Sequence, residues 1–206
     1  VEIDPQWPMT LGGAVELAAG EAYPGRHAER VTKEALLVVE RERGEAAVTC
    51  RFTPEQAVSD GLADVARGVA LTDLELDGVF HRLVRDLNLT IPAAAVGREV
   101  LVARARSLLG RATANAALML GSDGVPEDEV RAWLAETSLM DARFVDQALR
   151  EISTLPGRIA AFGHMAGPRV IAEWLEVQGQ THGLTRLLAE QLTPWRMSLE
   201  IQAPAG

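Results

Sequence analysis

Aromatic side chains are scarce in this chain. They make up 4% of its 206 residues, whereas hydrophobic residues as a whole make up 48%. A core with so few rings has to be built mainly from Leu, Val and Ala, and Ala and Leu fit a helix at little entropic cost. The composition therefore predicts an all-α fold, and the length suits one helical domain spanning residues 1–206.

Cysteine is almost absent, with Cys50 as the single example. One cysteine excludes an internal disulfide framework and a zinc site made of several thiolates. Because free cysteines are usually buried and inert, we expect Cys50 to be a buried thiol.

Long apolar runs and excess basic charge are also missing. No segment approaches the ~18 apolar residues that a membrane span requires, and the first residues lack the basic and apolar regions of a signal peptide. The net charge of −9 would repel the phosphates of a nucleic acid. We therefore expect a cytoplasmic protein whose partners include neither membrane nor nucleic acid.

Helical periodicity covers most of the chain. Apolar spacing and stop signals predict helices over residues 11–19, 27–43, 54–67, 73–87, 96–120, 126–137, 141–152, 158–178 and 183–191. Thr53 followed by Pro54 is a strong helix start, and Gln56 is placed to complete a capping box. Residues 46–52 alternate between apolar and polar, which is equally compatible with a short strand and an extended loop.

The most specific segment spans residues 20–27, which read Gly-Glu-Ala-Tyr-Pro-Gly-Arg-His. It resembles the His-Glu-Ala-Tyr-Pro-Gly-His-His motif of metallopeptidase-like proteins of unknown function, which are distantly similar to carboxypeptidase Taq. Weaker similarity continues through residues 117–125, 158–167 and 190–194, so the resemblance covers nearly the whole chain. It implies the C-terminal half of a gluzincin-like helical metallopeptidase, and the absence of an initial methionine fits a trimmed or split portion.

The resemblance also implies a site, and this chain departs from it. Metal ligands would stand at positions 20, 26 and 60, with Glu21 as the general base. Gly20 offers no ligand and Arg26 brings a permanent positive charge, while Asp60 keeps a carboxylate. Further along, Ala160 and His164 stand where tyrosines are expected, and Gly121 where a histidine is usual.

These departures predict a degenerate metal site and a protein that acts by binding or as a structural partner, with no cofactor. Under this hypothesis Arg26 binds an anionic group such as a peptide carboxylate, with Tyr23 and His27 beside it. Structural roles compete with this reading. Glu21 would simply pair with Arg26 or Arg30, Asp60 would cap or turn the chain, and His27 and Tyr23 would pack locally.

Two enzyme alternatives stay open. In the first, a relocated site of Glu21, His27, Asp60 and His164 holds zinc or another divalent metal for hydrolysis. In the second, the chain is one subunit of a split enzyme whose N-terminal region comes from a second chain. The sequence contains no nucleophile elbow, phosphate-binding loop or dinucleotide fingerprint that would favour another chemistry.

Overall fold

The predicted all-α class is confirmed by a computed structural model, which describes residues 9–138 and 140–203. The described residues contain ten α-helices and no strand. The helices are α1 (Leu11–Glu21), α2 (Arg26–Lys33), α3 (Pro54–Ala70), α4 (Asp73–Asp86), α5 (Ala93–Gly121), α6 (Glu127–Ser138), α7 (Ala142–Ile152), α8 (Leu155–Gln178), α9 (Gln180–Ala189) and α10 (Pro194–Gln202). A π-helical segment, η1 (Glu34–Glu40), extends α2, and a 3-10 turn, η2 (Gly44–Ala47), follows it.

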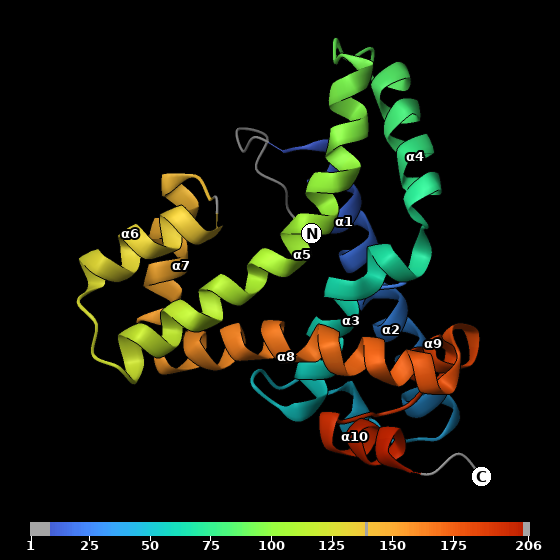
Figure 1. Ribbon diagram of the computed structural model, residues 1–206. Coiled ribbons are helices and arrows are strands. Elements are labelled where there is room, and N and C mark those ends of the chain that lie inside the picture. The colour runs from blue at the N-terminus through green and yellow to red at the C-terminus, as the bar shows by residue number, and fades with distance from the viewer. Residues whose placement is uncertain (1–8, 139, 204–206) are drawn as a thin grey trace.

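Two long helices organise the molecule (Figure 1). The first half of α5 forms a projecting hairpin with α4, and its second half runs beside α8 toward α6 and α7. Helix α8 crosses the molecule from that end to α9, and α3 packs against its middle. The α3–α8 contact is the most extensive between any two elements, so these helices form the frame on which the site is built.

The core has three parts. Phe80 lies in the part between α1, α4 and the start of α5, and Leu134 in the part between the end of α5, α6, α7 and α8. Trp174 lies in the third, where α3, α8, α9 and α10 meet. All three side chains have no exposed surface. Alanines supply much of the α5 contribution, as expected for a chain with few rings.

The backbones of α3 and α8 touch at two glycines. A Cβ added at Gly61 would lie 2.7 Å from the carbonyl carbon of Gly167, and one added at Gly167 would lie 2.9 Å from the carbonyl oxygen of Ala57. Real Cβ atoms do not approach backbone this closely, so the crossing requires glycine on both helices. It brings the polar face of α3 close to His164 on α8.

A polar network fastens α10 to this frame. The Arg186 guanidinium, largely buried, bonds to Glu190 and Glu200, and it lies 5.0 Å from the centre of the Trp174 ring. The hydrogen bond from Arg186 lowers the pKa of Glu200 to about 2, against an ordinary 4.5. A lowered carboxylate pKa stabilises the fold above the ordinary value, and this stability is lost as the pH falls from about 4.5 toward 2.

One open alternative is decided and two expectations need correction. Residues 46–52, which were equally compatible with a strand and a loop, form a loop: η2 occupies their start and the rest is irregular. Cys50 is exposed rather than buried, since that irregular segment lies at the surface. Helix α10 was missed, although Thr193 caps it and Pro194 begins it in the same manner as Thr53 and Pro54 begin α3.

Candidate functional site: an arginine between two carboxylates

A tight turn after α1 directs the first residue of α2. Helix α1 ends at Glu21 and α2 begins at Arg26, and the Tyr23–Pro24 peptide bond between them is cis. Gly25 lies directly against the end of α1, where a Cβ would come within 1.9 Å of the carbonyl oxygen of Gly20. Only glycine fits at this contact, and the turn places Arg26 facing α3.

The Arg26 guanidinium bridges two carboxylates. Nη1 donates to Oε1 of Glu21, and Nη2 donates to Oδ1 of Asp60 over 2.8 Å. Gln56 also donates to the same Asp60 oxygen over 2.8 Å. The three charged side chains are only 34%, 28% and 21% exposed for Arg26, Glu21 and Asp60. A planar guanidinium can donate to two acceptors at once. Arg26, the first residue of α2, therefore connects the end of α1 to α3.

The electrostatics keep this arginine charged. Burial lowers the pKa of Arg26, but the hydrogen bond to Asp60 and the charges of Glu21 and Asp60 outweigh that effect and leave the pKa raised. A cation with two anions leaves the centre with one net negative charge. Of the two partners expected for a structural Glu21, Arg26 and Arg30, the pairing with Arg26 is confirmed. Asp60 lies inside α3 and is neither a cap nor a turn residue.

The residues present do not fit a zinc ion at the positions that the family resemblance implies. Gly20 is buried against α3, and a Cβ there would lie 3.0 Å from the carbonyl oxygen of Ala63, so even the start of a histidine side chain is crowded. The Arg26 guanidinium already lies between the carboxylates of Glu21 and Asp60. A catalytic zinc needs three protein ligands and an open position, and this centre supplies two carboxylates joined by a cation.

The alternative metal site is not assembled either. Among residues 9–138 and 140–203, no three His, Cys, Asp or Glu side chains are grouped so that they could hold a metal ion. His27 is exposed at the start of α2, and Tyr23 is 65% exposed in the preceding turn. The structure therefore does not bring His27 and His164 together with Glu21 and Asp60 in one group that could hold a metal ion.

His164 has a different partner, one helical turn along α3 from Asp60. Its Nδ1 lies 2.9 Å from Oδ2 of Asp64. This hydrogen bond raises the pKa of His164 above its ordinary 6.5; burial opposes the rise, the charges of Asp64 and Asp60 add to it, and Arg26 works against it. The charges of Asp60 and Arg26 therefore affect the pKa of the imidazole. The polar face of α3 carries two electrostatically coupled pairs, Asp60 with Arg26 and Asp64 with His164.

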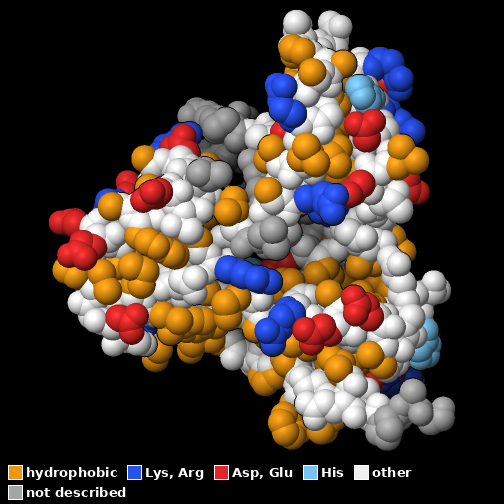
Figure 2. All heavy atoms as spheres, in the orientation of Figure 1, with side chains coloured by type: hydrophobic (Ala, Val, Ile, Leu, Met, Phe, Trp, Pro, Cys, Tyr) orange, Lys and Arg blue, Asp and Glu red, His pale blue; other side chains and the backbone are white. Residues whose placement is uncertain are grey.

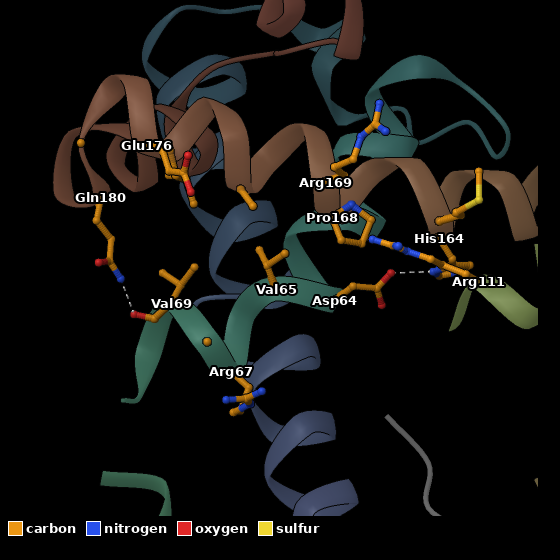
Figure 3. Close-up of a pocket in the computed structure, with 15 residues that line it drawn as sticks. Asp64, Val65, Arg67, Val69, Arg111, His164, Pro168, Arg169, Glu176 and Gln180 are labelled. Atoms are coloured by element: carbon orange, nitrogen blue, oxygen red, sulfur yellow. Dashed lines mark hydrogen bonds and ion pairs between the residues drawn. The ribbon is translucent and has the colours of Figure 1, made fainter. Parts of the chain in front are cut away.

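Two hollows adjoin this face. The smaller, of about 430 Å³, lies beside Arg26 and is lined by Glu29, Gln56 and Cys50 among others. Glu29 is only 5% exposed, and it accepts hydrogen bonds of 2.6 Å from both Lys33 and Ser59. The larger, of about 770 Å³, lies between α3 and α8 and includes the Asp64–His164 pair (Figure 3).

Sequence reasoning missed Gln56, Glu29 and Asp64 as members of the polar centre. Gln56, Asp60 and Asp64 follow at intervals of four residues, which places them on one face of a helix. That spacing was the available signal. Glu29 has a comparable signal in Lys33, four residues further along, whereas its other partner, Ser59, is distant in the sequence.

Comparison of the chain with protein-family models, with curated proteins and with solved structures finds no match. Within the described residues, no helix combines the length and apolarity needed to cross a bilayer.

Proposed function

We propose that this chain is a non-catalytic, metallopeptidase-like helical protein that acts by binding, with the Arg26 guanidinium in the place of a metal ion. The observation that carries the proposal is the bridge from Arg26 to Glu21 and Asp60. Both carboxylates stand at positions that serve as base and ligand in the resembled family. A charged guanidinium between them offsets one of their two negative charges and holds the carboxylates together, as a bound cation would.

The bridge from Arg26 to Glu21 and Asp60 also affects whether Arg26 can bind an anionic ligand. Two of the five N–H donors of Arg26 are committed to Glu21 and Asp60, and an anionic peptide end at the remaining donors would approach a centre that already carries one excess negative charge. Arg26 therefore serves better as an internal cation than as an anchor for a peptide carboxylate. Binding is more favourable at a neighbouring surface where a cation is unpaired.

Zinc titration tests the proposal. The wild-type protein, purified without a histidine tag, should contain well under one equivalent of zinc and should bind added zinc weakly. Arg26→His removes the blocking charge and adds an imidazole beside Glu21 and Asp60, so zinc affinity should rise by about tenfold or more. Arg30→His is the matched control, because Arg30 is exposed and its hydrogen bond to Thr49 lies at the surface.

Each outcome is informative. About one equivalent of zinc retained by the wild type would overturn the proposal and favour the metal-dependent hydrolase. Equal zinc affinity in the wild type and Arg26→His, whether tight or weak, would mean that the guanidinium is not what excludes the metal. A rise in both histidine variants would mean that any added imidazole suffices.

A further inference from the structure

The larger hollow is a groove that follows α8 (Figure 3). The groove extends along α8 from His164 to Gly179. At a helical rise of about 1.5 Å per residue, this distance is roughly 22 Å. Its volume of about 770 Å³ lies within the usual range for small-molecule sites, about 300–1,000 Å³. Apolar side chains from both helices line much of it: Val65, Val69, Met165, Pro168, Ala172 and Leu175.

Two donors lie where α8 passes α5. Arg111 of α5 lines this end of the groove, is exposed, and has no hydrogen-bond or ion-pair partner among the described residues. His164 donates to Asp64 through Nδ1, so its Nε2 can donate to a ligand when the imidazole is protonated, the state that the Asp64 hydrogen bond favours. The Asp64 charge is balanced by this pairing when His164 is protonated, so Arg111 remains the uncommitted cation.

The other end has the opposite character. Glu176 lines it, and Gln180 donates to the backbone carbonyl of Val69 over 3.0 Å, which ties α9 to α3 there. Arg67 also borders the groove, but its side chain points toward α1, where it pairs with Glu16 at 3.5 Å (Figure 3). A second anionic group on a ligand would meet Glu176 rather than a cation.

We infer that the α3–α8 groove binds an amphipathic monocarboxylate, with its anionic head at Arg111 and His164 and its apolar body along Val69, Ala172 and Leu175. The apolar lining favours burial of a hydrocarbon body, and an unpaired guanidinium favours a carboxylate. Figure 2 shows basic, acidic and apolar side chains together where α8 crosses the middle of the face. The inference rests on the proposed binding function, because it names what would be bound.

Calorimetric titration with decanoate is the first test, using the full chain at about millimolar ligand or below. Decanol, which has the same chain without the charge, and acetate, which has the head alone, should both bind at least about tenfold more weakly. A short apolar peptide with a free C-terminal carboxylate, compared with its amide, distinguishes a peptide source from a fatty-acid source of the same chemistry.

Variants locate the site. Arg111→Gln should weaken decanoate binding by about tenfold, while Arg82→Gln, an exposed arginine on α4 outside the groove, should not change it. Ala172→Glu should weaken binding more than Ala172→Gln, because the two side chains differ mainly in charge and both suit a helix. Circular dichroism confirms that each variant is folded.

Three results would overturn the inference: no heat from decanoate, equal binding of decanol, or unchanged affinity in both Arg111→Gln and Ala172→Glu. Each is independent of the zinc result at Arg26. Failure here with a zinc-free wild type would leave the internal cation in place and remove only the groove as a carboxylate site.

Discussion

Replacing Arg26 by glutamine should destabilise the protein by about 2 kcal/mol at neutral pH. The change leaves Glu21 and Asp60 facing each other without the cation that bridges them. Exposed ion pairs contribute about 0.2–1 kcal/mol each, and breaking a fully buried pair costs about 3–5 kcal/mol. The three side chains are between 21% and 34% exposed, so each of the two pairs falls between these limits and nearer the lower one.

Urea unfolding followed by circular dichroism at pH 7 measures the change. Arg30→Gln is the matched control and should cost less than about 0.5 kcal/mol, since Arg30 is exposed and its bond to Thr49 is at the surface. Asp60→Asn combined with Arg26→Gln should recover about half of the loss, because it removes one of the two facing charges. Recovery identifies repulsion as the cause, which lost packing alone would not produce.

Two results would refute the internal-cation reasoning. The first is equal stability of wild type and Arg26→Gln at pH 7. The second is no recovery of stability when Asp60→Asn is added to Arg26→Gln.

Two further predictions follow from the frame around the site. Gly61→Ala should lower the free energy of unfolding by about 1–3 kcal/mol, because its Cβ would meet the Gly167 backbone. Gly68→Ala, on the same helix, faces open space and should raise it by about 0.5–1 kcal/mol. Equal melting temperatures for the two variants would contradict the close crossing. Asp64→Asn should lower the pKa of His164 measured by NMR, because the Asp64 hydrogen bond is the main cause of its rise while Asp60 and Arg26 are unchanged. A raised histidine pKa stabilises the fold below pH 6.5, the ordinary value, and this contribution is lost as the pH rises through the pKa of the folded protein. Wild type should therefore lose stability over this pH range, whereas Asp64→Asn should not. An unchanged His164 titration in the variant would contradict the pairing.

Local chemistry explains why most of the helices could be predicted. Thr53 caps α3 through the backbone amide of Gln56, as expected, and Pro54 begins that helix. The side chain of Gln56 does not complete the capping box but donates to Asp60, because this carboxylate, one turn further along the same helix, competes for it. The full capping box lies instead at Thr72 and Glu75.

Tertiary contacts explain what could not be predicted. The alternation over residues 46–52 could not decide between a strand and a loop, because a strand needs a partner strand, and none is present in the described residues. The direction of Arg26 depends on a turn whose geometry is set by the approach of Gly25 to Gly20. Arg111 carries no sequence signal at all, because its position matters only once α5 lies beside α8.

Gly20 and Arg26, two residues at which the chain differs from the motif that it resembles, depend on each other. Gly20 lets α1 lie so close to α3 that an added Cβ would be 3.0 Å from the Ala63 carbonyl oxygen. That closeness brings Glu21, at the end of α1, within reach of the guanidinium that also holds Asp60. A side chain at position 20 would require α1 and α3 to shift by a few tenths of an ångström, which would strain the bridge from Glu21 to Arg26, and without Arg26 the same approach would leave two carboxylates facing each other. The glycine and the arginine therefore support one arrangement, in which close helix packing sets two carboxylates around an internal cation.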